Sequence, residues 1–233
     1  WYARYYLESF RLPELTAAEV DAGFSYEGFG PIEDAVAAGT GPILALPHLG
    51  TWEWAAFWLA LVPRMRVTAV VEPLEPPEVF EWFVGFRRSL GMNIVPLGPD
   101  AGRELLGAIR RGDVTCLLCD RDIGGTGVPV EFFGERTTLP AGPATLALRT
   151  GAPLIPAAVY WSDVDRHAIA RPPLDTERRG RLRDDVARVT QDLAHELEWL
   201  VRQAPEQWHM LVPNWPSDLE ALGEPVPEHW RDL

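Results

Sequence analysis

The sequence predicts an α/β protein with a central, mostly parallel or mixed sheet that is flanked by helices on both faces. Short apolar runs alternate along the chain with stretches of helical periodicity, which is the order of βαβ units. The runs are apolar at nearly every position, as strands buried on both faces must be. Hydrophobic residues make up 47% of the 233 residues, enough for a substantial core.

The individual elements follow from these patterns. Strands are expected at 42–47, 66–72, 93–97, 114–120 and 153–160, with a further short one near 167–171. Helices are expected at 51–61, 77–90, 102–111 and 142–150, and the first twelve residues also look helical. An apolar stripe every three or four residues predicts a long amphipathic helix over 178–203. The tail after 205, rich in Pro and Trp, is expected to wrap the body as loops and short turns.

Charge and composition exclude several functions. Asp+Glu 34 against Lys+Arg 21 gives a formal net charge of −13, so nucleic acid is not an expected partner. Every one of those basic residues is Arg, which excludes a Schiff-base lysine and a P-loop lysine. The longest strongly apolar stretch, 54–62, is far shorter than the ~20 residues of a membrane-spanning helix.

Two cysteines lie three residues apart in a single predicted strand. Side chains at an odd spacing point to opposite faces of a strand, so Cys116 and Cys119 are expected to be buried, unpaired hydrophobes. Such sparing use of cysteine fits a reducing compartment.

A histidine at a strand end is the first candidate for chemistry. His48 follows the strand 42–47 in a Gly-containing turn, where ligands bind in open α/β sheets. Glu53 lies in the first turn of the next helix, from which its carboxylate can reach back to the imidazole and leave the other ring nitrogen as a base. A turn histidine followed by a favourable first-turn charge explains the same residues without catalysis.

A charged triplet at another strand end is the second candidate. Asp120, Arg121 and Asp122 close the strand 114–120 and precede a Gly-rich loop. Three charges there indicate either an internal ion-pair cluster or the wall of a site. The loop lacks the spacing and the following helix of a dinucleotide-binding fingerprint.

Three motifs in this order carry a resemblance: HLGTWEWA, VEPLEPPEVFEWFVGFRRSLGMNIVPL and DRDIGGTGVPVEFFGERTTLPAGPATLALRTGAPLIP. From Trp1 to about Trp208 the chain resembles the lipid A biosynthesis (lauroyl/myristoyl-type) acyltransferases, and most closely their actinobacterial branch, the phosphatidylinositol mannoside acyltransferases. The resemblance implies a glycerolipid-acyltransferase-like fold. It also implies one acyltransferase domain over 1–233 that lacks a native N-terminal membrane-associating segment.

The resemblance also implies roles for individual residues. His48 and Glu53 match the family's H-x4-D/E pair, with Glu in place of the commoner Asp. His48 would be the general base, and Glu53 or Asp122 would orient its imidazole. Substrate binding falls to the matches of the E…R pair and of the D-x-D strand end, namely Glu72, Arg87, Asp120 and Arg121.

The implied activity is transfer of a palmitoyl-like chain from acyl-CoA to a mannose hydroxyl of phosphatidylinositol mannoside. No cofactor and no metal are expected. The implied partners are acyl-CoA, the lipid-linked mannoside and the inner leaflet of the cell membrane, with the enzyme peripheral on the cytoplasmic face. A lipid A-type acceptor with an acyl carrier protein donor is a second reading on family grounds.

Other classes stay open as alternatives. A thioester hydrolase would use the same histidine to activate water, whereas a serine hydrolase lacks its G-x-S-x-G elbow. A zinc enzyme lacks H-E-x-x-H, and a silent lipid-binding module would keep only the cavity. The aromatic helix 51–61 is either core or the lining of an acyl groove, and His209 is a minor candidate for the site. Arginines at 178–183 either face solvent or contact anionic groups.

Overall fold

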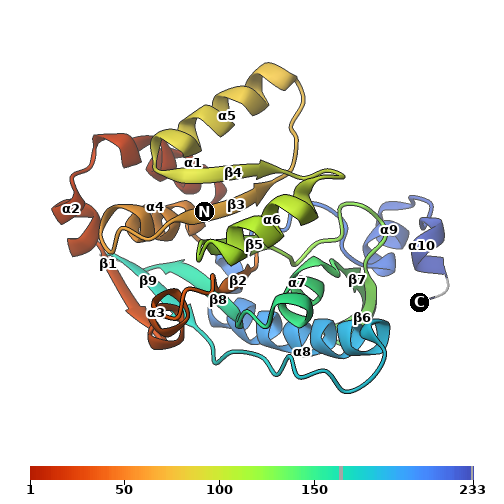
Figure 1. The fold of residues 1–233 in the computed structure, drawn as a ribbon. Coiled ribbons are helices and arrows are strands. Elements are labelled where there is room, and N and C mark those ends of the chain that lie inside the picture. Colours follow the sequence, from red (N-terminus) through yellow and green to blue (C-terminus); the bar gives the residue numbers. More distant parts are fainter. Residues whose placement is uncertain (163–164, 232) are drawn as a thin grey trace.

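A computed structural model describes residues 1–162, 165–231 and 233 (Figure 1). Its centre is a seven-stranded sheet with the strand order β1-β9-β8-β2-β5-β3-β4. The strands of this sheet are β1 (Phe24–Glu27), β2 (Ile43–Leu46), β3 (Val67–Val71), β4 (Met92–Pro96), β5 (Val114–Leu118), β8 (Leu154–Trp161) and β9 (Arg166–Ala170).

The sheet is mixed, as the sequence predicts. Strands β8, β2, β5, β3 and β4 are parallel neighbours. Strand β9 is antiparallel to β8, and β1 runs parallel to β9 at the edge. The carboxyl ends of five strands therefore meet at one edge of the sheet.

Helices cover both faces (Figure 1). One face packs against helices from the N-terminal half, and these are α1 (Tyr2–Arg11), α2 (Ala17–Ala22), α3 (Gly30–Ala37), α4 (Trp52–Leu61) and α5 (Pro77–Ser89). The other face packs against α6 (Ala101–Arg110), α7 (Gly142–Thr150) and α8 (Leu182–Gln203). A short 3₁₀ helix, Leu12–Glu14, follows α1.

Alternation within the central strands builds two cores from one sheet. Ile43 and Ala45 of β2 belong to the core beneath α6–α8, and Leu44 and Leu46 belong to the core beneath α1–α5. All residues of β2 and β8 are buried, which explains their uninterrupted apolar sequences. Cys116 and Cys119 lie in opposite cores, unpaired and buried, as their spacing predicts.

Most predicted boundaries are confirmed to within one or two residues, but the long amphipathic helix begins at Leu182 rather than at 178. Asp185, in its first turn, accepts hydrogen bonds from the Arg178 side chain and from the backbone N–H of Arg179 and Gly180. The carboxylate thus holds residues 178–180 in a loop. Arg178 pairs with Asp185 in that loop, and Arg179 pairs with an acidic side chain upstream.

A hairpin outside the main sheet was not predicted. Strands β6 (Val128–Phe132) and β7 (Glu135–Leu139) pair across a turn in which Phe133 and Gly134 both have positive φ. The hairpin is tied to α8, because the backbone N–H of Phe133 donates to the Glu198 carboxylate at 2.8 Å. Alternating polarity on either side of the turn is the signal in the sequence, but the F-G dipeptide is not one of the usual N-G or D-G hairpin turns.

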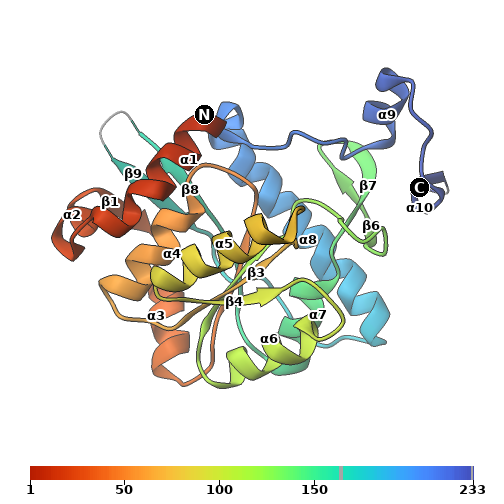
Figure 2. The same cartoon turned by 90° about the horizontal axis from the view of Figure 1, so that it is seen from above.

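The segment after α8 crosses the carboxyl edge of the sheet toward the hairpin (Figure 2). It contains the 3₁₀ helix Pro205–Gln207, then α9 (Pro216–Leu222) and α10 (Glu228–Arg231). The Gln207 side chain exchanges two hydrogen bonds with the backbone of Trp161 at the end of β8, at 2.8 and 2.9 Å. The tail therefore contains short helices as well as the predicted loops and turns, and it is hydrogen-bonded to the edge of the sheet.

Within the described part of the chain, no helix combines the length and the apolar character that crossing a bilayer requires.

The backbone of Gly50 lies very close to the backbone of β8, behind the predicted site. Its φ is +61°, and a Cβ there would lie 1.7 Å from the carbonyl oxygen of Val159. We expect Gly50→Ala to lower the free energy of unfolding by about 2 kcal/mol or more, because strain and a backbone clash add together. Urea denaturation measures this loss.

Gly39→Ala is the matched control for that substitution. Gly39 has a φ of +77°, but its Cβ would meet nothing within 4 Å. It should lose only about 1 kcal/mol, the cost of a left-handed alanine. Equal losses at the two positions would contradict the close approach of Gly50 to β8.

Candidate active site

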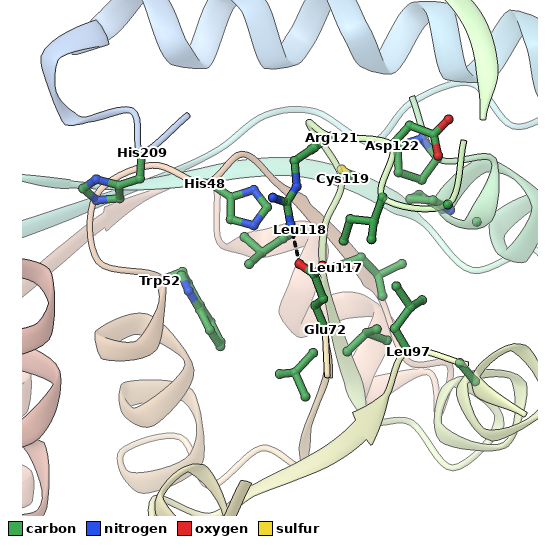
Figure 3. A pocket seen from close by; sticks show the side chains of 18 of the residues that line it. His48, Trp52, Glu72, Leu97, Leu117, Leu118, Cys119, Arg121, Asp122 and His209 are labelled. Atoms are coloured by element: carbon green, nitrogen blue, oxygen red, sulfur yellow. Dashed lines mark hydrogen bonds and ion pairs between the residues drawn. The ribbon is translucent and has the colours of Figure 1, made fainter. Parts of the chain in front are cut away.

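A cavity of about 750 Å³ opens at the carboxyl edge of the parallel strands. It lies between loops that follow β2, β3 and β5, the starts of α6 and α7, helices α1 and α5, and the segment after α8. Figure 3 shows His48, Glu72, Arg121 and Asp122 around this cavity. The position is the one that the strand topology predicts for a ligand site.

His48 and Asp120 face each other because of strand register. Leu46 and Leu118 are paired at the ends of β2 and β5, and each chain continues for two residues to reach His48 and Asp120. The Nδ1–H of His48 donates to Asp120 Oδ1 at 2.5 Å. The imidazole lines the cavity with 29% of its side chain exposed, and Nε2 has no hydrogen-bond partner among the described residues.

Asp120 is fully buried and nevertheless charged. Its Oδ2 accepts the backbone N–H of His48 and the indole N–H of Trp208, both at 2.8 Å. Burial by itself raises the pKa of this carboxyl, but the imidazole and the hydrogen bonds outweigh it, and the pKa lies below its ordinary value. Burial lowers the pKa of His48, whereas the charge and the hydrogen bond of the Asp120 carboxylate raise it. The net shift of the His48 pKa is upward.

The structure corrects the expected partner of His48. Glu53 does not reach the imidazole, because the first turn of α4 directs its side chain into the core beneath α1 and α5. There it accepts a hydrogen bond from Arg87 at 2.7 Å with only 2% of its side chain exposed. Asp120, expected to bind substrate, instead lies behind the imidazole and orients it.

Asp122 does not orient His48 either. Its Oδ2 accepts the backbone N–H of Gly127 at 2.8 Å and the hydroxyl of Thr138 at 2.9 Å. These bonds shape the Gly-rich loop and fasten it to β7, while the residue also lines the cavity. Arg121 and Asp122 at the charged strand end therefore form part of the cavity wall, while the three charges of the triplet contact other residues instead of one another.

Two arginines line the cavity, each neutralised by a carboxylate. Arg121 forms a short ion pair with Glu72, and in Figure 3 this pair lies between His48 on one side and Leu97 and Leu117 on the other. Arg87 is held by Glu53, so the expected Glu72 and Arg87 are both at the cavity but are not partners of each other.

The cavity has two chemically different regions. Beyond the Glu72–Arg121 pair its wall is apolar, with Val70, Leu97, Leu105, Leu117 and Leu146. Around Arg87 it is aromatic, and the residues there are Tyr2, Tyr5, Tyr6, Trp52, Phe83 and His209. We call these the apolar arm and the aromatic arm.

Of the aromatic residues of helix α4, only Trp52 lines the cavity. Trp52 lines the aromatic arm, and the Arg87 guanidinium lies 5.1 Å from its ring centroid. Trp54, Phe57 and Trp58 are instead buried in the core beneath α1–α5. Of this helix, only Trp52 lines the large cavity, so the core interpretation describes the other three rings.

Sequence reasoning missed most of what the C-terminal segment does. The indole N–H of Trp208 donates to the carboxylate of Asp120, which together with His48 we call the dyad. The backbone N–H of His209 donates to the His48 carbonyl at 2.7 Å. The His209 imidazole bonds the Gly50 carbonyl at 3.2 Å and lines the cavity. Burial lowers the pKa of His209, the opposite of the shift at His48. The W-H dipeptide was visible, but nothing local places it beside residue 48.

Among the described residues no group of three or more His, Cys, Asp or Glu side chains could hold a metal ion. Cys119 lines the cavity, and burial raises the pKa of its thiol well above the ordinary value, which disfavours a thiolate nucleophile. What the site offers is an oriented imidazole with one free nitrogen, in a cavity that has an apolar wall.

Comparison with known proteins identifies the family of the chain. The family described as bacterial lipid A biosynthesis acyltransferase matches residues 1–217. The chain belongs to this family. It is an acyltransferase whose candidate site is built on an imidazole–carboxylate pair.

Curated relatives narrow the branch of the family. Phosphatidylinositol mannoside acyltransferases from two strains of Mycobacterium tuberculosis are 38% identical to this acyltransferase, over 94% of the chain and 69% of their own length. The protein of that name from Mycolicibacterium smegmatis is also 38% identical, over 94% of the chain and 71% of its own. The resemblance seen in the three sequence motifs is thereby confirmed.

The pairing of His48 with Asp120 leads to a prediction about the pKa of His48. In Asp120→Asn the imidazole stays buried but loses its carboxylate, so the pKa of His48 should fall by at least about one unit. Titration of the imidazole signals by NMR measures the change. Asp122→Asn is the control, because its carboxylate contacts Gly127 and Thr138 instead of His48, and should leave the His48 titration where it is. A His48 pKa that is equal in Asp120→Asn and the wild type would contradict the assigned pairing.

Proposed function

We propose that this acyltransferase moves a palmitoyl-like chain from acyl-CoA directly to a mannose hydroxyl of phosphatidylinositol mannoside, with His48 as the general base. The observation that carries the proposal is the free Nε2 of an imidazole whose Nδ1–H is held by buried Asp120. Similarity to the mycobacterial phosphatidylinositol mannoside acyltransferases supports the choice of acceptor.

The reaction needs no covalent enzyme intermediate. The acceptor hydroxyl gives its proton to His48 Nε2 as its oxygen attacks the thioester carbonyl carbon. The tetrahedral intermediate then expels the CoA thiolate, which takes the proton from the imidazolium. Asp120 stabilises the imidazolium throughout, because its charge lies 2.5 Å from Nδ1. Activity should rise with pH as the free base of His48 forms, and the upward shift of the His48 pKa places this rise at a higher pH than for an ordinary histidine.

The two arms of the cavity suit the two substrates. In the apolar arm, side chains such as Leu105, Leu117 and Leu146 provide a recess that removes an acyl chain from water. The aromatic arm offers flat apolar faces with polar edges, as at Tyr5 and Trp52, which suit the faces and hydroxyls of a sugar ring. His48 stands where the arms meet, so the thioester carbonyl and the hydroxyl would come together beside it.

Arg121 and Arg87 are the positive groups available to the anionic parts of the reaction. A guanidinium suits either the developing oxyanion or a substrate phosphate. Arg121 pairs with Glu72 at the boundary with the apolar arm, and that position favours it for the thioester end. We assign to Glu72 the role of holding Arg121. We assign Arg87 to the acceptor side of the cavity.

We propose contact with the inner leaflet of the membrane, from its cytoplasmic face. The rim of the cavity supports contact with a membrane. Large apolar residues at the rim are exposed, and these are Leu74, Leu97, Ile123, Leu211 and Val212. Such side chains around the entrance of a site for lipid substrates favour insertion at a membrane interface.

Thiol release from palmitoyl-CoA tests the reaction. We expect release from the wild type only when phosphatidylinositol mannoside is present, and a fall of about 10²–10⁴-fold in His48→Ala, the usual contribution of a general base. Mass spectrometry of the lipid product confirms transfer.

Each other outcome contradicts a different part of the proposal. Release without acceptor indicates a thioesterase, and full release by His48→Ala removes the histidine as the base. Activity on a lipid A-type acceptor with an acyl carrier protein donor, and none on the mannoside, would replace the acceptor and donor proposed here.

Co-sedimentation with anionic vesicles tests the membrane contact. Leu211→Asp should reduce the bound fraction severalfold, because it places a charge in an apolar rim residue that is 68% exposed. Leu222→Asp is the matched control: Leu222 is 64% exposed on α9 and does not line the cavity. Equal loss in both variants would argue against insertion of the rim.

A further inference from the structure

The carboxylate of Asp120 accepts hydrogen bonds from two residues of different origin, His48 and Trp208. Oδ1 accepts the Nδ1–H of His48, and Oδ2 accepts the indole N–H of Trp208 at 2.8 Å as well as the backbone N–H of His48. Asp120 has 0% exposure, so water cannot replace a missing donor from the outside. Its charge is therefore distributed among these three N–H groups.

Trp208 is held firmly in its place by aromatic packing. Its ring lies 5.7 Å from that of Phe133 and 6.1 Å from that of Trp215, measured between centroids. Its backbone forms an antiparallel bridge to Leu49, next to His48 in the chain. The hairpin β6–β7 and the C-terminal segment thus determine where the indole N–H points.

A hydrogen bond to one oxygen of a carboxylate draws negative charge away from the other oxygen. If the indole N–H is removed, Asp120 Oδ1 becomes the stronger acceptor and binds the His48 imidazolium more tightly. A histidine that holds its proton more tightly is less often a free base at neutral pH. The indole also restrains rotation of the carboxylate, and so keeps the imidazole aligned.

We propose that Trp208 is a positioning residue of the dyad, whose indole N–H orients the Asp120 carboxylate and moderates its pull on His48. The proposal rests on the proposed role of His48 as base. It adds a third member, contributed by the C-terminal segment, to a pair built from β2 and β5. The effect of Trp208 on the Asp120 charge agrees with the indole being among the groups that lower the pKa of that carboxyl.

The test compares Trp208→Phe with Trp215→Phe. Both variants remove one indole N–H from the same aromatic cluster, but Trp215 donates to the backbone carbonyl of Phe132 at 3.0 Å and does not touch Asp120. Two readouts are taken for each variant: the pH dependence of kcat/KM for acyl transfer, and the NMR titration of the His48 imidazole without substrates.

In Trp208→Phe we expect the His48 titration and the acid limb of kcat/KM to move to higher pH together, by about 0.5 to 1 unit. In Trp215→Phe both should stay at their wild-type positions. An unchanged titration in Trp208→Phe, or one that moves to lower pH, overturns the proposal. The titration needs no turnover, so failure of the proposed reaction is distinguishable from failure of this inference.

A second substitution removes the question of packing. If Trp208→Phe does not fold, Trp208 is replaced by 3-benzothienylalanine, which keeps the shape of the indole and has sulfur in place of N–H. The same upward shift is expected. In an Asp120→Asn background the replacement should leave the His48 titration unmoved, since no carboxylate remains to be moderated. A shift that persists in that background would show that Trp208 acts on His48 by another route.

Discussion

The buried carboxylate of Asp120 is the constraint on which the rest of the site depends. A charge with no exposure costs several kcal/mol unless donors surround it. Here the donors are the ring and backbone N–H of His48 and the indole N–H of Trp208. They come from the loop after β2 and from the segment after α8, so the carboxylate is satisfied only when both lie against the end of β5. The pairing of His48 with Asp120 therefore requires the sheet edge and the C-terminal segment to be in place together.

The same edge explains why the cavity has two kinds of wall. Parallel strands end there, and the helices that follow them diverge to opposite faces of the sheet. The space on the α6–α7 side is bounded by aliphatic core residues, which leaves an apolar recess. The space on the α1–α5 side is bounded by rings and by Arg87, which Glu53 holds from behind. His48 lies on the boundary because β2 is central in the sheet.

Local pattern was sufficient for most of the elements and insufficient for the pairing of charges. The apolar runs and periodic stretches located the strands of the main sheet from β2 to β8, and helices α4 to α7, to within one or two residues. The spacing from His48 to Glu53 suggested a contact that the start of α4 prevents, since the helix turns the glutamate toward Arg87. The family motif identified the residues, but it pointed to Glu53 or Asp122 as the carboxylate that orients the imidazole and to Asp120 as a substrate-binding residue, whereas Asp120 is the one that faces His48. The offset of two residues between Asp120 and Asp122 at the end of β5 determines which carboxylate faces the imidazole, and this follows only from the register of β2 and β5.

By itself the sequence determined the fold class, the position of His48 at a strand end, the charged end of β5 and membership of an acyltransferase family. These depend on short-range periodicity and on motifs that are contiguous in the chain. Tertiary structure alone decided that Asp120 orients His48, that Glu72 holds Arg121, and that Trp208 completes the dyad. In these three contacts the partners are separated along the chain by 72, 49 and 88 positions, respectively. They follow from the strand order β2-β5-β3 and from the path of the C-terminal segment, which no local pattern specifies.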